Sequence, residues 1–386
     1  MSAGPPQDYI ARAAAPWDAD DVTGALAAGL GPGPFALVML FVSPRADVAR
    51  IAAEAAARLP AAHVTGCTTA GEICDAGYAE GMVLALGFPA RHFAAELLAL
   101  TDLDRFSRAE AAAAFLDARQ QLATDHAHLP HEFALLLVDG LSLREDDLAS
   151  ALAAGAGSVP LIGGSAGDGA RFAETLVIHD GRVLRHAAVL SVLRSACPVR
   201  ALNMDHLRPT PRRMVVTSAD PAARIVRRLN DAPAAQEYAR ILGMAPGLID
   251  YVTFASHPLA VRLGGRYHVR AVQRVLPSGE LLFFSAIDEG VVLALTEPQD
   301  LAAHLDRRLS ELAAPAAPVV LGFDCILRRI EAEQSQRAGA VSEVLRRHGV
   351  WGFSTYGEQF GPLHVNHTLT GCAIYPPGTR LPEQGE

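Results

Sequence analysis

The sequence contains no lysine, so all 33 of its Lys and Arg positions are arginine. A phosphate-binding loop that ends in Gly-Lys-Ser/Thr needs a lysine, as do a Schiff-base pyridoxal-phosphate enzyme and a protein kinase. The absence of lysine therefore excludes these three classes of protein. Arginine remains available to bind carboxylate or phosphate groups through its planar guanidinium.

Long apolar runs and a signal peptide are also absent. The longest apolar runs, at residues 34–42 and 133–138, are far shorter than the roughly 20 residues that cross a bilayer. The first ten residues, MSAGPPQDYI, lack the basic region and the apolar core of a signal peptide. We therefore expect a cytoplasmic protein without a membrane segment.

Cysteine is scarce, and basic charge is not in excess. The five cysteines form no Cys-x-x-Cys pair, which argues against a zinc ribbon or a dithiol redox site, so we expect reduced, mostly buried thiols. Neither an HExxH motif nor an EF-hand loop occurs. The formal charge of −9 provides no basic face, so nucleic acid is not an expected partner.

What the sequence does contain is a threefold repeat of strand, helix, strand and loop. Buried strands are predicted at 35–43, 133–140 and 318–325, and helices follow at 46–59, 144–156 and 326–349. Each helix leads to a second strand and then to a loop: GCTTAGE (66–72), GGSAGDG (163–169) or GFSTYGE (352–358). This alternation predicts an α/β fold of repeated strand–helix–strand units with a mostly parallel sheet.

None of the three loops leads into a helix. The chain instead runs to another predicted strand, at 81–88, 175–181 and 369–376. A dinucleotide-binding fingerprint or a phosphate loop requires a helix N-terminus directly after its glycines, so neither is predicted. The loops lie at the carboxyl ends of parallel strands, where open α/β sheets bind ligands.

The segment between the second and third copies has a different pattern. Residues 214–242 are predicted to form a strand and two helices, and residues 251–296 an antiparallel meander with turns at 264–265 and 277–279. This pattern indicates a smaller C-terminal lobe. The expected domains are an N-terminal extension (1–33), an N-terminal sensory domain (34–213), a C-terminal domain (214–376) and a tail (377–386).

The pentapeptide GGSAG at 163–167 matches the GxSxG nucleophile elbow of serine hydrolases. The elbow requires a helix directly after the serine, whereas a strand is predicted here. Ser165 also aligns with Thr68 and Ser354 in the other copies, and three equivalent nucleophiles would not make one catalytic site. A serine hydrolase that uses Ser165 is therefore the least favoured alternative, and we expect these hydroxyls to cap their turns or to donate to a ligand.

The acids Glu72, Asp168 and Glu358 occupy matching positions in the three loops. They could act as general bases, but carboxylates that accept backbone N–H groups and hold the loop shape are the favoured interpretation. Neither role needs a metal. With the neighbouring Thr69 and Tyr356, they complete the polar groups of the loops.

Two histidine-containing segments are candidate ligand sites. His257, in FASHPLAV, precedes a proline, and HVNH at 364–367 places Asn366 and His367 close to the third loop. A lone histidine in such a setting is usually a hydrogen-bonded structural residue, and ligation of a metal or a haem is the alternative.

These motifs, taken in order, resemble the FIST-domain family. The N-terminal half of the family pattern is matched by GCTTAGEI and LIGGSAGDG, and the C-terminal half by FDCILRR, GFSTYGEQ and HVNHT. The resemblance covers about residues 35–376. It implies an intracellular sensory module of bacterial signalling, which binds small molecules and is not an enzyme.

The resemblance also implies specific ligands and partners. One standalone branch of the family, the nitric-oxide-sensing proteins called NosP, binds haem and regulates a histidine kinase or a cyclic-di-GMP enzyme, either a diguanylate cyclase or a phosphodiesterase. No kinase or cyclase segment is apparent in this sequence, so a separate partner is expected, and a homodimer is left open. We therefore expect a haem-binding nitric-oxide sensor.

Haem requires an apolar pocket, a neutral imidazole for the iron and arginines for the propionates. The expected iron ligand is His257, with Arg262 or Arg270 for the propionates, and His268, His364 and His367 compete for the iron. The alternative is a metal-free sensor of a small polar metabolite such as an amino acid. Its ligand would be held by Thr68, Thr69, Glu72, Ser165, Asp168, Ser354, Tyr356, Glu358, Asn366 and His367.

Overall fold

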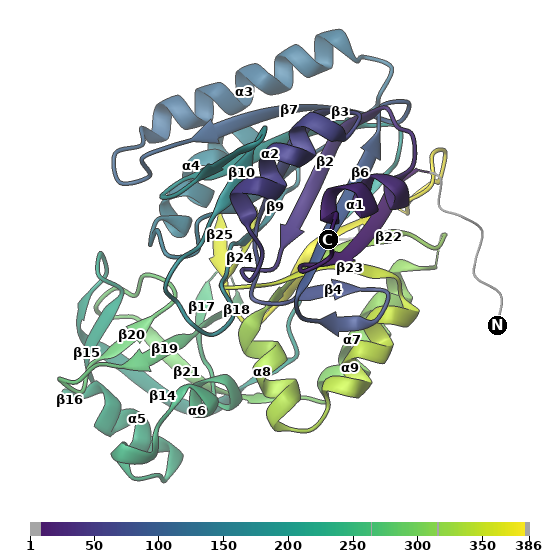
Figure 1. Ribbon diagram of the computed structural model, residues 1–386. Helices are drawn as coiled ribbons and strands as arrows, with labels where there is room; N and C mark the ends of the chain where they lie inside the picture. Colours follow the sequence, from purple (N-terminus) through teal and green to yellow (C-terminus); the bar gives the residue numbers. More distant parts are fainter. Residues whose placement is uncertain (1–8, 264, 315, 383–386) are drawn as a thin grey trace.

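The chain contains three copies of the same order of strands and helices (Figure 1). A computed structural model describes residues 9–263, 265–314 and 316–382, so the ends of the expected extension (1–8) and tail (383–386), and residue 264 of a predicted turn, lie outside the described residues. Each repeat consists of an edge strand, a helix, a strand, one or two helices, a parallel strand, a hairpin and a return strand.

The elements of the three repeats have the following bounds. The first repeat contains β1 (Ala11–Pro16), α1 (Val22–Leu30), β2 (Phe35–Val42), α2 (Val48–Arg58), β3 (Ala61–Thr68), β4 (Glu72–Cys74), β5 (Gly77–Ala79) and β6 (Met82–Pro89). The second contains β7 (Phe93–Leu100), α3 (Arg108–Asp125), β8 (His131–Val138), α4 (Glu145–Ala156), β9 (Leu161–Ser165), β10 (Val177–His179), β11 (Arg182–Leu184) and β12 (Ala188–Ser195). The third contains β13 (Val199–Met204), α7 (Leu301–Leu312), β22 (Val319–Cys325), α8 (Ile326–Gln334), α9 (Ala338–Arg347), β23 (Val350–Thr355), β24 (Glu358–Phe360), β25 (Leu363–Val365) and β26 (Leu369–Ile374).

The repeats build three six-stranded sheets that exchange their hairpins. The strand orders are β1-β6-β2-β3-β10-β11, β7-β12-β8-β9-β24-β25 and β13-β26-β22-β23-β4-β5. The hairpin of the first repeat therefore joins the sheet of the third, that of the second joins the first, and that of the third joins the second. Each sheet is completed by a neighbouring repeat.

The α/β class is confirmed, but the predicted mostly parallel sheet is wrong. In each six-stranded sheet one neighbouring pair is parallel, β2 with β3, β8 with β9 or β22 with β23, and the other pairs are antiparallel. The helix between the paired strands sets their parallel direction. The return strand and the adjoining hairpin strand run opposite to this pair, and the edge strand and the second hairpin strand run opposite to those neighbours. Local sequence patterns do not carry this information.

The central strands are buried on both faces because each lies between two hydrophobic cores. In FALVMLFV, alternate side chains point to opposite faces, so Leu37, Met39 and Phe41 enter a central core while Val38, Leu40 and Val42 pack beneath α1 and α2. The strand β8 divides its side chains in the same way between the central core and the core under α3 and α4. The three sheets thus face one another across the central core, and the helices cover their outer faces (Figure 1).

A glycine at the same place in each repeat lets the two parallel strands approach closely. A Cβ at Gly66, Gly163 or Gly352 would lie 2.3, 2.2 or 1.7 Å from the carbonyl oxygen of its partner on the preceding strand. No side chain fits at these distances. This contact explains why each loop motif begins with glycine.

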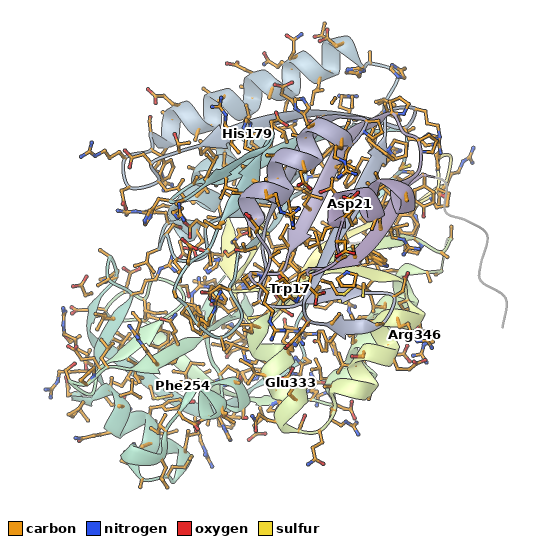
Figure 2. The ribbon with its side chains drawn as sticks, viewed as in Figure 1. Trp17, Asp21, His179, Phe254, Glu333 and Arg346 are labelled. Atoms are coloured by element: carbon orange, nitrogen blue, oxygen red, sulfur yellow. The ribbon has the colours of Figure 1, made fainter. Side chains whose placement is uncertain are left out.

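An antiparallel lobe, residues 207–298, is inserted into the third repeat between β13 and α7. Its strands are β14 (Leu207–Asp220), β15 (Ile225–Leu229), β16 (Ala232–Pro233), β17 (Leu259–Leu263), β18 (Arg266–Arg270), β19 (Val272–Val275), β20 (Leu281–Phe283) and β21 (Val292–Pro298), and its helices are α5 (Ala234–Leu242), the short η1 (Pro246–Leu248) and α6 (Tyr251–Ser256). The inserted lobe has its own hydrophobic core, to which Phe254 belongs (Figure 2). The chain enters and leaves it through adjacent segments, because Gln299 N–H donates to His206 O at 2.9 Å.

Two elements predicted in this lobe differ from the structure. Residues 251–255 were expected to begin the meander but form α6, because the Asp250 carboxylate accepts the Thr253 N–H in a capping box. The helix predicted after residue 218 is instead the hairpin of β14 and β15. The expected domain boundary at 213–214 lies within β14.

Among the described residues, all five cysteines are buried and none forms a disulfide. No helix in this part of the chain is both long and apolar enough to cross a membrane.

Candidate functional site

The first loop (68–72), the second loop (165–169) and the third loop (354–358) meet at one place, which we term the loop hub. Main-chain hydrogen bonds run from Gly167 N–H to Thr68 O (3.0 Å), from Ala70 N–H to Ser354 O (2.9 Å) and from Ser165 N–H to Gly357 O (2.8 Å). Each loop is thereby bonded to the other two. These main-chain groups serve the fold and are not available to a ligand.

The acids of the first and third loops are also used within the hub. Thr69 Oγ1 donates to Glu72, which also accepts the Met82 N–H at 3.0 Å. In the third loop, Glu358 accepts Thr355 Oγ1 at 2.6 Å and Thr368 Oγ1 at 2.8 Å. Burial raises the pKa of both carboxyls, that of Glu358 to about 8, and the hydrogen bonds from the threonines only partly oppose this rise.

The acid of the second loop has a different environment. Asp168 accepts the N–H groups of Phe172 at 2.8 Å and of Ala173 and Glu174 at 3.0 Å, together with the Tyr356 hydroxyl. Burial works to raise the pKa of Asp168, but the hydrogen bonds from Tyr356 and the three N–H groups outweigh it, so the pKa is lowered. The Tyr356 ring stacks on Phe172 at 4.4 Å between centroids. Asp168 thus holds the loop in the way favoured from the sequence.

The three aligned hydroxyls are all buried. Thr68 Oγ1 accepts the Leu176 N–H at 3.0 Å, and Ser165 Oγ accepts Gln359 Nε2 at 2.9 Å, whereas Ser354 Oγ has no hydrogen-bond partner. A nucleophilic serine needs a base that accepts its proton, and the partner of Ser165 is a donating amide. The geometry offers no support for the hydrolase alternative.

Next to the hub, fully buried polar side chains lack partners. Neither Oδ1 nor Nδ2 of Asn366 forms a hydrogen bond, and the same holds for Nε2 of His364. Both side chains pack over Gly357, where a Cβ would lie 2.7 Å from His364 Nε2 and 3.1 Å from Asn366 Nδ2. Burial lowers the pKa of His364, so its ring is uncharged at neutral pH.

The inserted lobe adds polar groups to the same place. Arg270, at the end of β18, is buried and donates from Nη1 to His364 O at 2.9 Å. Ser285 is fully buried, its Oγ has no partner, and it follows Phe284, whose N–H donates to Ala271 O beside Arg270. We call Arg270, Ser285, His364 and Asn366 the interlobe polar cluster, because the first two belong to the lobe and the others to the core.

Charged groups around this cluster join the lobe to α4. Arg224 of the lobe is buried and donates to Glu145 at 2.6 Å and to Asp146 at 3.5 Å. Asp146 also accepts the Ala286 N–H at 3.4 Å. The two acids at the start of α4 are therefore held by Arg224 and by the lobe backbone.

A second buried network, the hinge network, lies where the chain enters the lobe. His206 Nε2 is 2.9 Å from Glu331, and its Nδ1 is 3.1 Å from Nη1 of Arg328, which in turn binds Asp324 at 2.6 Å. A guanidinium can only donate, so Nδ1 is the acceptor and Nε2–H donates to Glu331. Burial, reinforced by Arg328, lowers the pKa of His206 to about 2 and keeps it neutral.

The hinge network reaches His367, which is fully buried and adopts a left-handed φ of 59°. Its Nδ1 is 3.8 Å from Glu331 Oε2, and neither ring nitrogen has a hydrogen-bond partner at standard geometry. Burial, opposed by Glu331, lowers the pKa of His367 to about 3. Glu331 therefore lies between the hinge residue His206 and the segment that carries Asn366.

The residues expected to hold haem do not converge. His257 ends α6, is half-buried and places Nδ1 3.3 Å from the Thr253 carbonyl. Arg270 pairs with Leu259 across the β17–β18 hairpin and Arg262 pairs with Tyr267, so the two arginines leave opposite faces. Arg262 is exposed and Arg270 is buried, so at most one of the two alternatives can face a porphyrin bound at His257.

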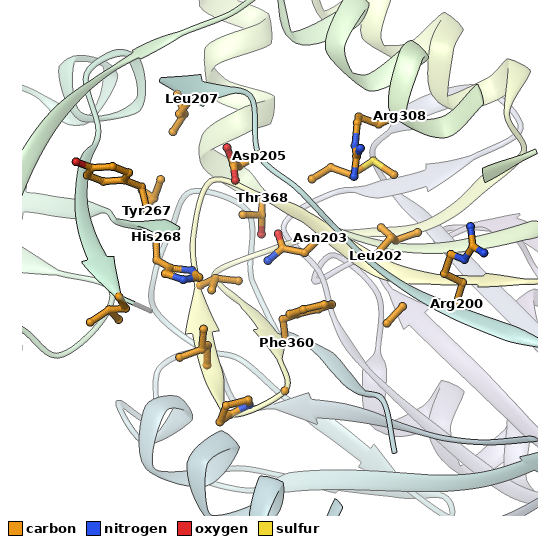
Figure 3. A pocket seen from close by; sticks show the side chains of 18 of the residues that line it. Arg200, Leu202, Asn203, Asp205, Leu207, Tyr267, His268, Arg308, Phe360 and Thr368 are labelled. Carbon is orange, nitrogen blue, oxygen red and sulfur yellow. The ribbon is translucent and has the colours of Figure 1, made fainter. Parts of the chain in front are cut away.

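A groove of 1150 Å³ lies between the inserted lobe and the core (Figure 3). Tyr267 and His268 approach it from the lobe, and Asn203 and Phe360 approach it from the core. Much of its lining is apolar, and Arg200 and Arg308 also border it. A smaller cavity of 330 Å³ beside the hub is lined by Thr69, Glu72 and Asp168 together with the exposed Arg45 and Arg171.

Several residues around the site were not singled out from the sequence. They are His206, Arg224, Glu145, Asp146, Ser285, Arg328, Glu331 and Gln359. Arg328 lies within FDCILRR and Gln359 ends GFSTYGEQ, so these two motifs of the family resemblance were the available signal. The others come from distant elements, and only the fold brings them together.

Comparison with known families identifies the chain. The FIST N domain matches residues 36–232 and the FIST C domain matches residues 234–361. The second match begins within the inserted lobe and ends in the third repeat. No match was found among curated proteins. The chain therefore belongs to the FIST family, whose domains are sensory, ligand-binding domains of signal transduction.

Proposed function

We propose that this protein is a cytoplasmic sensor that binds a small polar molecule at the interlobe polar cluster. The observation that carries the proposal is Asn366, a fully buried amide with neither polar atom hydrogen-bonded. A buried donor or acceptor without a partner costs about 1–3 kcal/mol. A ligand that both donates and accepts hydrogen bonds would supply the partners that Asn366 lacks.

The position of the cluster couples binding to the arrangement of the lobe. A ligand beside Asn366 and His364 of the core would also contact Arg270 and Ser285 of the lobe, so it would favour one position of the lobe over others. Glu331 then links the same segment to His206 at the entry to the lobe. We propose that a separate histidine kinase, diguanylate cyclase or phosphodiesterase responds to this change.

The test replaces Asn366 with leucine, which has a similar size and no polar atoms. Without ligand, Asn366→Leu should raise the free energy of unfolding by about 1–3 kcal/mol, because two unpartnered groups are removed. The variant should also lose any rise in melting temperature that wild type shows with a panel of small organic acids, amides and amino acids. A destabilised Asn366→Leu protein that still responds to the panel would refute the proposal.

Thr370→Val is the matched control. Thr370 on β26 is also fully buried with an unpartnered hydroxyl, but it lies outside the interlobe polar cluster. The substitution should leave the response to ligands intact.

Haem is a second candidate ligand, because the interlobe groove could accept it. Around His257, Arg262 and Arg270 lie on opposite faces of their hairpin, so one arginine at most would meet the propionates there. The groove has the volume, apolar side chains, an imidazole from His268, and Arg200 and Arg308 as possible propionate partners. When bound there, haem would supply an iron that binds nitric oxide, and His268 would hold that iron.

Absorption spectra separate the two histidines. With haem supplied, the proposal expects a Soret band that shifts on addition of nitric oxide, is lost in His268→Ala and is retained in His257→Ala. Loss of the band only in His257→Ala would return the iron to His257. Absence of the band in wild type would eliminate haem and leave the polar ligand.

A further inference from the structure

Four arginines are buried among the residues that the structure describes, and three of them are ion-paired. The pairs are Arg224 with Glu145 at 2.6 Å, Arg328 with Asp324 at 2.6 Å, and Arg329 with Glu80 at 3.1 Å and with Glu333 at 3.0 Å. Arg270, which is 8 % exposed, is the exception in this part of the chain, since no carboxylate lies within 4.0 Å of it. A buried charge is normally paired, because removal from water without a counter-ion is costly.

The guanidinium of Arg270 is also underused as a donor. Of its five N–H groups, the one on Nη1 that meets the His364 carbonyl makes the only hydrogen bond formed with described residues. Asp146, whose charge acts on Arg270, is already paired with Arg224 at 3.5 Å. Burial lowers the pKa of Arg270, as expected for a cation that lacks a partner.

We infer that the ligand of the interlobe polar cluster carries a carboxylate group, which the Arg270 guanidinium binds. This inference rests on the proposed function and specifies its ligand class. Unpartnered polar atoms of Asn366, His364 and Ser285 lie along the same interface and can bind the remaining polar groups of the ligand. The fork of an arginine matches the two oxygens of a carboxylate.

The surrounding charges favour a carboxylate over a phosphate. The charge of Asp146 acts on Arg270, and the charges of Asp146 and Glu145 act on His364. His364 is neutral and Arg224 is already paired, so Arg270 is the cation of this group that remains for the ligand. A phosphate dianion would bring two negative charges close to these acids. A single carboxylate balances Arg270 without this repulsion.

The experiment compares acids with their amides. Wild type, Arg270→Met and Arg262→Met are each titrated with three acids (acetate, lactate and succinate), with their amides (acetamide, lactamide and succinamide) and with inorganic phosphate. The melting temperature and the heat of binding are measured for every combination. At least one carboxylate should bind wild type and Arg262→Met, whereas its amide should not. Arg270→Met should weaken that binding by about 100-fold. Arg262 lies on the same hairpin but is exposed on its other face, which makes it the matched control.

Each result has a defined meaning. If an amide binds as well as its acid and both depend on Asn366 but not on Arg270, the carboxylate inference is wrong while the proposed function stands. Stronger binding of phosphate also overturns it, as does a wild-type protein that none of the seven compounds affects.

Discussion

At the scale of single residues, the buried polar groups are of two kinds: those with local hydrogen-bond partners and those with none. In the loop hub, Thr69 binds Glu72 and Thr355 binds Glu358 at the same spacing of three residues, so the acids hold their own turns. The sequence could predict this role because donor and acceptor are local. It could not predict that Asn366 would lack partners, because this depends on Gly357 and on a lobe that folds from residues about 100 positions away.

Glu358 should make stability depend on pH. Burial raises its pKa to about 8 from an ordinary value of 4.5, so between these values the folded protein keeps a proton that the unfolded chain releases. The contribution of Glu358 to stability should therefore be complete below pH 4.5 and be lost as the pH rises from 4.5 to 8. Relative to Glu358→Gln, wild type should lose on the order of 1 kcal/mol per pH unit in urea unfolding.

The control for this pH dependence is Glu110→Gln, which changes an exposed glutamate on α3. Its free energy of unfolding should follow wild type at every pH. If wild type and Glu358→Gln run parallel from pH 5 to 8, the carboxyl is ionised in the folded protein and the assigned role is wrong.

At the scale of elements, local patterns located many strands and helices but not their pairing. The strands at 35–43, 133–140 and 318–325 and the loops after them could be predicted because their apolar runs and glycines are contiguous. The exchange of hairpins between sheets could not, since β4 pairs with β23, more than 270 residues away. The helix predicted at 326–349 is divided into α8 and α9, where Gln336 has a φ of 57°.

This break between the helices predicts opposite effects for the same substitution at two nearby positions. Gln336→Gly should stabilise the protein by about 1 kcal/mol, because glycine adopts the left-handed conformation without steric cost. Ala340→Gly, at an exposed position inside α9, should destabilise it by about 1 kcal/mol through the poor helix propensity of glycine. Urea unfolding followed by circular dichroism measures both, and a destabilised Gln336→Gly would show that the left-handed turn is absent.

Two features define the whole molecule: the exchange of hairpins between the three sheets and the insertion of the lobe into the third repeat. Each sheet contains a hairpin from another repeat, so no repeat is complete alone, whereas the inserted lobe has its own core and two adjacent connections. The family matches meet between residues 232 and 234, within the lobe, and therefore do not divide the chain where the fold does. The proposed ligand would lie at the junction of lobe and core, a boundary that none of the described sheets crosses, so a change there need not open a sheet.

The exchange of hairpins predicts that the first and third repeats unfold together. The chain has two tryptophans, Trp17 in the first repeat and Trp351 on β23, and Trp351 Nε1 donates to Asp75 of the first repeat at 2.8 Å. In Trp351→Phe only Trp17 reports, and in Trp17→Phe only Trp351 reports. Each variant is followed in urea by fluorescence and by circular dichroism, which is the internal control for any shift caused by the substitution. The Trp17 and Trp351 transitions should have the same midpoint when each is taken relative to the circular dichroism of its own variant, because the loss of either sheet removes strands from its neighbour. A Trp17 transition that is complete before Trp351 begins to change would mean that the repeats are independent domains and that the exchanged hairpins do not hold the core together.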